Sequence, residues 1–178
     1  MRARFLALIG WIREELAEIA RSAQRARDLC QKALRTGDDG YWDGVALNLH
    51  GFYTGVERIF EEIAREIDGH RPGGPDWHRD LLVQMSAEIP GIRPPVLSRE
   101  TRECLDEYRG FHHLVRHIYA FRLKPERLQE LAEGVEPCLK RLRQDLERFA
   151  DFLHRMAGSE AEAPTGEGSA REDPASTP

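Results

Sequence analysis

A short stretch of this chain gathers residue types that handle phosphate chemistry. Residues 108–122 read YRGFHHLVRHIYAFR and contain three of the seven histidines of the chain. Between residues 109 and 127, five lysines and arginines stand against one acid, Glu126, which gives a formal charge of +4 before any histidine protonates. A compact positive cluster of this kind attracts polyanions, of which phosphate esters are the commonest.

Histidine and arginine together suit the metal-free transesterification of RNA. A histidine with a pKa near about 6.5 can move a proton at neutral pH, and an arginine can stabilise the negative charge of the phosphorane. The residue types also leave a second interpretation open, and on their chemistry alone it is the favoured one. In that interpretation the basic cluster is a solvated face or a surface that binds a partner.

Other chemistries find less support in the sequence. His113 and His117 are spaced i,i+4, as in two-histidine zinc sites, but the HExxH context is missing and a third ligand is not evident. The sequence has no Gly-rich phosphate loop with its lysine and no sharp turn that would present a serine nucleophile. We therefore expect no metal site and no cofactor.

The three cysteines, Cys30, Cys104 and Cys138, are far apart and odd in number. No pair has metal-ligand spacing, and the pattern implies no disulfide framework. Each lies on or beside an apolar helical stripe, so we expect three small buried hydrophobic side chains in a reducing compartment.

Helical periodicity dominates the chain and predicts the elements that must position the basic stretch. Apolar residues recur at intervals of three and four, and no strand pattern occurs. The predicted helices cover about 3–35, 41–67, 76–87 with Asp76 as cap, 98–120 with Ser98 as cap, and 125–156. The basic stretch forms the end of the fourth helix, and Gly134 and Pro137 predict a kink or a break in the last one. The predicted fold is all-α, an antiparallel up-and-down helical bundle of four main helices plus one short helix.

The ends of the chain set the domain boundaries and the expected compartment. Residues 1–157 predict one helical domain, whereas 158–178 have no aliphatic or aromatic residue larger than Ala and a net charge of −4, which is typical of a disordered tail. The apolar run at the N-terminus is short and is interrupted by Arg13, Glu14 and Glu15, so we expect neither export nor a membrane span. We expect a cytoplasmic protein.

The central stretch resembles the signature helix of HEPN domains, specifically of HepT-like toxins. The pattern of that family is an arginine, four to six residues, a histidine, one residue and a tyrosine, and its second half matches His117 and Tyr119. The segments 52–64 and 76–82 are also similar to the second and third helices of the family. The resemblance covers roughly residues 8–153.

The resemblance implies a function and its partners. It implies a homodimeric toxin of a type II toxin–antitoxin system that cleaves RNA without metal, with two signature helices meeting in a cleft. It also implies a nucleotidyltransferase-type antitoxin that adenylylates (AMPylates) the tyrosine of the motif, here Tyr119. The expected site residues are His117, His112 and Arg116 for catalysis, and Arg109, His113 and Arg122 for substrate binding.

One position departs from the family pattern. The arginine expected five residues before His117 is replaced by His112, while Arg116 and Arg109 lie nearby but out of register. Arginine offers a planar, permanently charged fork to phosphate, whereas histidine is mostly neutral at pH 7. The alternative is therefore a catalytically weakened HEPN helical module that binds an antitoxin or nucleic acid without cutting.

Overall fold

The structure is a computed structural model that describes residues 2–117, 119 and 122–159. Within this part the chain forms helices and no strand, with only an isolated bridge between Ile89 and Arg93, so the predicted all-α class is confirmed. The elements in order are α1 (Arg2–Thr36), α2 (Gly40–Ile63), a π-helical turn (Ala64–Asp68), α3 (Trp77–Ser86), α4 (Arg99–Val115) and α5 (Pro125–Ser159).

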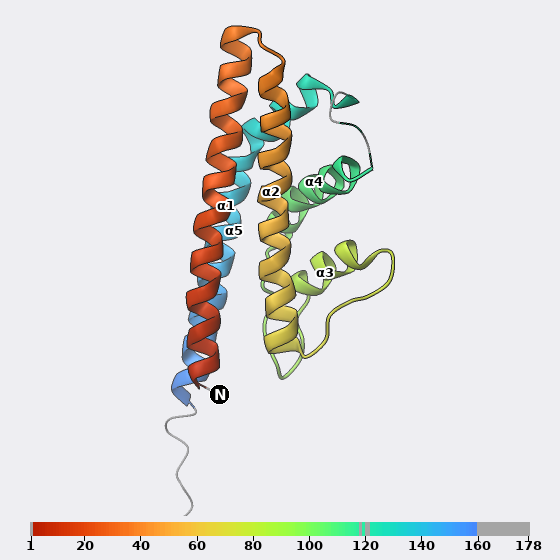
Figure 1. Cartoon of the computed structure of the whole chain (residues 1–178). Coiled ribbons are helices and arrows are strands. Elements are labelled where there is room, and N and C mark those ends of the chain that lie inside the picture. The colour runs from red at the N-terminus through yellow and green to blue at the C-terminus, as the bar shows by residue number, and fades with distance from the viewer. Residues whose placement is uncertain (1, 118, 120–121, 160–178) are drawn as a thin grey trace, which may run out of the picture.

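The long helices α1, α2 and α5 lie side by side and form the body of the molecule (Figure 1). α1 packs most extensively against α2 and then against α5, while α4 lies against both α2 and α5, and α3 contacts α2 and α4. Gly55 permits the close approach of α1 and α2, because a Cβ at this position would lie 2.5 Å from Cγ1 of Ile19. The buried apolar side chains of these helices form one continuous core.

A buried arginine holds the π-helical turn after α2 against the loop that precedes α4. Arg93 is 3% exposed, and its guanidinium forms a two-point pair with Asp68, at 2.6 Å from Nε to Oδ1 and 2.8 Å from Nη2 to Oδ2. Its remaining N–H groups donate to the backbone carbonyls of Gln84, Ala87 and Pro94. Because every donor of this buried cation has an acceptor, the pair fixes α2, α3 and the following loop in one arrangement.

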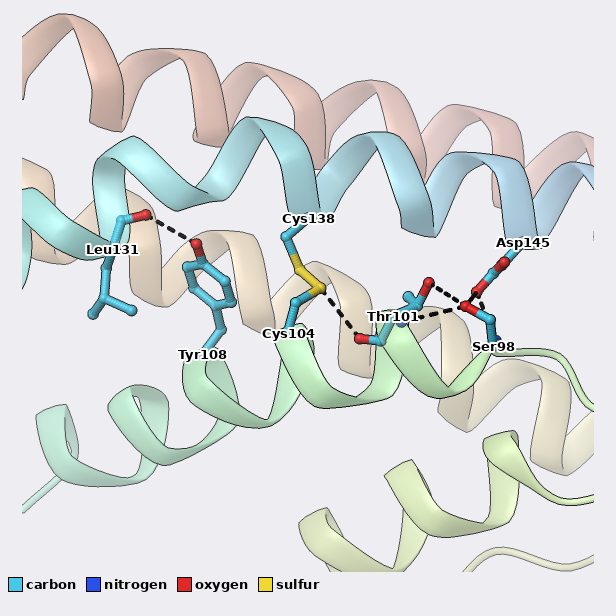
Figure 2. Close-up of a disulfide and its surroundings, with 7 residues drawn as sticks. All are labelled: Ser98, Thr101, Cys104, Tyr108, Leu131, Cys138 and Asp145. Carbon is cyan, nitrogen blue, oxygen red and sulfur yellow. Dashed lines mark hydrogen bonds between the residues drawn. A yellow bond between two sulfur atoms is a disulfide. The ribbon is translucent and has the colours of Figure 1, made fainter.

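Helix α4 begins where the sequence predicts. The Ser98 hydroxyl accepts a hydrogen bond from the Thr101 N–H at 3.3 Å, and the buried Asp145 carboxylate of α5 accepts from both the Ser98 N–H and its hydroxyl (Figure 2). This cap satisfies a backbone donor that the first helical turn cannot. It also ties the start of α4 to α5.

The end of α4 differs from the prediction. The helix stops at Val115, so the second half of the basic stretch lies beyond it rather than on it. The His117 N–H bonds to the Leu114 carbonyl three residues back, at 3.0 Å, which tightens the chain into a turn. Arg116 keeps right-handed helical dihedral angles as the last residue of this helix end, and His117 lies in the turn that follows it.

Helix α5 runs through both residues that were expected to interrupt it. Pro137 lies inside the helix, and Figure 1 shows a change of direction in the N-terminal part of the ribbon but no break. Packing explains why a glycine stands at position 134. The Tyr108 hydroxyl donates to the Leu131 carbonyl at 2.9 Å, and a Cβ on Gly134 would lie 3.2 Å from that hydroxyl. α1 and α4 pack against this helix, which continues past Pro137 although proline lacks a backbone donor. The helix ends at Ser159, and the rest of the expected tail lies outside the described residues.

The expectation for two of the cysteines is wrong. Cys104 of α4 and Cys138 of α5 form a disulfide, with their Cα atoms 5.9 Å apart, whereas Cys30 is a free buried thiol as expected (Figure 2). Sequence spacing could not reveal the pair, because the packing of α4 on α5 brings the two residues together. Disulfides persist mainly in oxidising compartments, so this bond is at odds with the reducing compartment that the cysteine count suggested. None of the helices in the described ranges has the length and apolar content that a membrane crossing requires.

Candidate functional site

A cluster of histidines lies where α2, α3 and the second half of α4 meet. His112 is 5% exposed, and its ring stacks on that of His50 with centroids 4.3 Å apart and planes 9° apart. Tyr53 and His78 complete the surroundings, with ring centroids 5.5 and 5.8 Å from that of His112. The cluster therefore joins side chains from three helices that are distant in the sequence.

A chain of hydrogen bonds runs from the buried part of this cluster to the surface. Glu57 of α2 pairs with Nδ1 of His78, and Nε2 of His78 lies 3.2 Å from Nη1 of Arg116. Arginine can only donate, so Nε2 of His78 accepts and its Nδ1 carries the proton given to Glu57. Glu57 thus sets the tautomer of His78, and His78 positions the guanidinium of Arg116.

Burial sets the charge of the inner groups. Desolvation lowers the pKa of His112 to about 4, and the positive charge that His50 and His78 can carry lowers this pKa further. Desolvation, followed by the charge of Arg116, also lowers the pKa of His50. The pKa of Glu57 is raised by desolvation, although its bond to His78 opposes the shift. At pH 7 the His112 imidazole is therefore neutral, and the permanent positive charge at this end of α4 comes from the arginines.

The outer part of the site is exposed. Nδ1 of His117 lies 2.7 Å from the His113 carbonyl oxygen, and the two rings have centroids 4.6 Å apart. Because a carbonyl only accepts, Nδ1 of His117 donates and Nε2 of the neutral ring keeps its lone pair. Arg109 is occupied by Asp106, with Nε 2.6 Å from Oδ1.

The predicted site residues fall into two groups in the structure. His113, Arg116 and His117 lie on the exposed end of α4 and the turn after it, together with the exposed side chains of Tyr119 and Arg122. His112 instead points into the protein and contacts α2 and α3. Arg116 and His112 therefore both lie next to His78. Arg116 is at the protein surface, whereas His112 is inside the protein.

Sequence reasoning missed Glu57 and His78. Glu57 is 7% exposed and stands within the apolar stripe of α2, between Val56 and Phe60. An acid at such a position is a signal in itself, since a buried carboxylate requires a partner. His78 follows Trp77 at the start of α3, and only the docking of α3 on α2 and α4 shows what it contacts.

One group of side chains in the described part of the chain has the composition and spacing to hold a metal ion. Glu57, His78 and His112 each offer one ligand atom, and these atoms lie within 4.8 Å of one another. Local spacing in the sequence does not indicate this set, because its members come from three different helices. The i,i+4 pair His113 and His117, which the sequence did suggest, lies on the exposed side.

The protein is all-helical in its described part, and the end of its fourth helix is basic and rich in histidine. A comparison with family models identifies the family to which it belongs. A family model described as "HepT-like protein" matches residues 44–153, which is more than half of the chain. The chain belongs to the HepT-like family, as its signature stretch predicted. The matched region contains α2, apart from its first turn, together with α3 and α4, and so includes every residue of the candidate site. Searches of curated proteins and of solved structures found no match.

Proposed function

We propose that this protein is a HepT-like toxin that cleaves RNA without a metal ion. The observation that carries the proposal is the position of Arg116, which His78 holds at 3.2 Å next to the exposed His117. A permanent cation and a titratable imidazole then flank the same patch of surface. This pairing suits a phosphodiester, whose cleavage needs proton transfer and stabilisation of added negative charge.

In this proposal each residue of the exposed site has its own role in the reaction. Nε2 of His117 takes the proton of the ribose 2′-hydroxyl, and the 2′-oxygen attacks the phosphorus while Arg116 stabilises the phosphorane. The bond to the 5′-oxygen breaks, and that oxygen takes a proton from His113, whose ring lies 4.6 Å from that of His117. The products are a 2′,3′-cyclic phosphate and a free 5′-hydroxyl. Arg109 and Arg122 bind the neighbouring phosphates, and the buried His112 packs behind the site without touching RNA.

Family membership supports the remaining parts of the proposal. The protein acts as a homodimer on RNA, and a nucleotidyltransferase-type antitoxin neutralises it. Tyr119 is 70% exposed, so its side chain is accessible to a modifying enzyme. Adenylylation of Tyr119 would add a negative phosphate two residues from His117 and would repel the RNA backbone.

Cleavage of RNA in the presence of EDTA tests this function directly. The wild-type protein should leave cyclic phosphate ends, and His117→Ala should lower the rate by about a hundredfold or more, the usual contribution of a proton-transfer group. His154→Ala is the matched control, because His154 is an exposed histidine on α5 outside the site. Activity that requires an added divalent metal would contradict the proposed mechanism.

The neutral state of His112 favours a second candidate, a weakened module that binds its antitoxin or nucleic acid and cuts little. Because the pKa of His112 is about 4, the site lacks the permanent cation that the family pattern has at this position. The two candidates separate in cells. Growth arrest on expression that His117→Ala abolishes supports the enzyme, whereas equal harmlessness of the two proteins supports the module.

A further inference from the structure

Three side chains on the inner face of the candidate site take no direct part in the proposed cleavage, in which Glu57 and His78 only position Arg116. Glu57 from α2, His78 from α3 and His112 from α4 place one carboxylate and two imidazole ligand atoms within 4.8 Å of one another. Side chains of this kind are the ordinary ligands of zinc-class ions in proteins. All three are sheltered, with Glu57 and His112 buried and the His78 side chain 15% exposed.

A second observation points to a ligand at the same place. His112 is 5% exposed, and its buried Nδ1 has no hydrogen-bond partner in the structure. A buried polar atom without a partner is costly, so such atoms usually mark a bound water, an ion or a functional role. His50, which stacks on His112, also has a buried Nδ1 without a partner.

We propose that Glu57, His78 and His112 form a binding site for one divalent transition-metal ion of the zinc class. Ligand atoms around a tetrahedral zinc ion stand about 3.4 Å apart, given metal–ligand bonds of about 2.0–2.1 Å. The three atoms can reach that spacing by small side-chain rotations, since they already lie within 4.8 Å of one another. Three protein ligands leave a fourth position for water, on the side where His78 is partly exposed.

The ion would take the place of the proton shared by Glu57 and His78, and this has a consequence for Arg116. A neutral imidazole that binds metal through Nδ1 carries its proton on Nε2. Nε2 of His78 could then no longer accept from Arg116, which lies 3.2 Å away in the metal-free structure. Metal binding therefore releases Arg116 from His78, and the positive charge of Arg116 opposes the ion.

The test uses the full chain without an affinity tag and without RNA, so its result is independent of the proposed cleavage. Metal-free protein is titrated with Co²⁺, whose visible absorption reports coordination by nitrogen and oxygen, and with Zn²⁺ in a calorimeter. We expect one equivalent per chain. His112→Ala, His78→Ala and Glu57→Gln should each weaken binding by about a hundredfold or more, because each removes a ligand and even the loss of an outer-shell partner costs about 10–100-fold.

Two further variants make the test selective. Arg116→Gln removes the competing cation and hydrogen bond and should tighten binding by about threefold to tenfold. His113→Ala, which disrupts the exposed i,i+4 pair, should leave binding unchanged. Far-UV circular dichroism checks that each variant is folded, and Glu57→Gln keeps the shape of the side chain if His112→Ala does not fold.

Two outcomes would overturn the proposal. One is the absence of stoichiometric binding by the folded wild-type protein. The other is binding that survives Glu57→Gln and His112→Ala but is lost in His113→Ala, which would assign the ion to the exposed pair.

Discussion

His112 is an uncharged imidazole enclosed by three helices, and this makes the stability of the metal-free protein sensitive to acid. The groups around it are His50, Tyr53 and Glu57 on α2, His78 on α3 and Arg116 at the end of α4. A proton added to His112 would be buried next to other groups that are positive or can become so. The unfolded chain therefore binds this proton more readily than the folded chain does.

The sign of the pH effect follows from the lowered pKa. A histidine with a pKa of 6.5 in the unfolded chain and about 4 in the folded one contributes stability above pH 6.5 that is lost as the pH falls towards 4. Between pH 7.5 and 5 this loss amounts to about 2 kcal/mol of unfolding free energy. The raised pKa of Glu57 works in the opposite direction, because a carboxyl that binds its proton more readily in the folded chain stabilises the fold as the pH falls.

Urea denaturation of wild type and His112→Gln at both pH values, in EDTA, isolates the contribution of His112. Glutamine does not titrate, so the variant should lose about 2 kcal/mol less than wild type over this interval. The contributions of Glu57 and His50 are present in both proteins and cancel in the comparison. Equal losses would show that His112 is protonated as easily in the folded protein as in the unfolded one.

At the level of residues, the sequence located the exposed half of the site but not its buried half. His113, Arg116 and His117 are neighbours along the chain, so local spacing was enough to group them. The contact of Glu57 with His78 spans 21 residues and that of His78 with Arg116 spans 38. Contacts of this range depend on how α3 docks, which periodicity does not determine.

At the level of single elements, the sequence predicted the presence of each helix more accurately than the residue at which it ends. The repeat of apolar residues located every helix, and Ser98 marked the start of α4 through a local hydrogen bond that a sequence can reveal. The end of α4 at Val115 was missed because Val115 and residue 118 continue the apolar spacing past the point where the backbone turns. For α5 the sequence predicted a kink or a break at Gly134 and Pro137, and the structure has one continuous helix that changes direction in its N-terminal part.

The disulfide between α4 and α5 makes a contribution to stability that can be measured. Cys104 and Cys138 are separated by 34 residues, and closing a loop of this length in the unfolded chain stabilises the fold by about 3–4 kcal/mol. Reduction with dithiothreitol should lower the unfolding free energy of the wild type by this amount in urea denaturation.

A variant that lacks both cysteines of the disulfide serves as the control for this measurement. The double variant Cys104→Ala, Cys138→Ala should be insensitive to dithiothreitol, and it retains the free Cys30. The unreduced wild-type protein, once denatured, should react with a thiol reagent at Cys30 alone. Labelling of all three cysteines under these conditions would show that the bond does not form.

For the whole molecule, the sequence predicted the fold class and the family, and both are confirmed. The absence of any strand pattern and the strength of helical periodicity were enough for the all-α class. The signature stretch was enough for the family, because its histidine and tyrosine lie close together in the chain. How the helices pack around the site was not encoded in any local pattern, and the disulfide and the metal-ligand set both depend on that packing.

The bond between Cys104 and Cys138 also encloses every residue of the signature stretch in a covalent ring of backbone. Arg116 and Arg122 are exposed within that ring and offer cleavage sites to trypsin. A single nick after either of them should leave two fragments that migrate as one intact chain on a non-reducing gel and separate once a reductant is added. A protease that severs the polypeptide beside His117 would therefore leave the two halves of the molecule tethered, with α4 still fastened to α5.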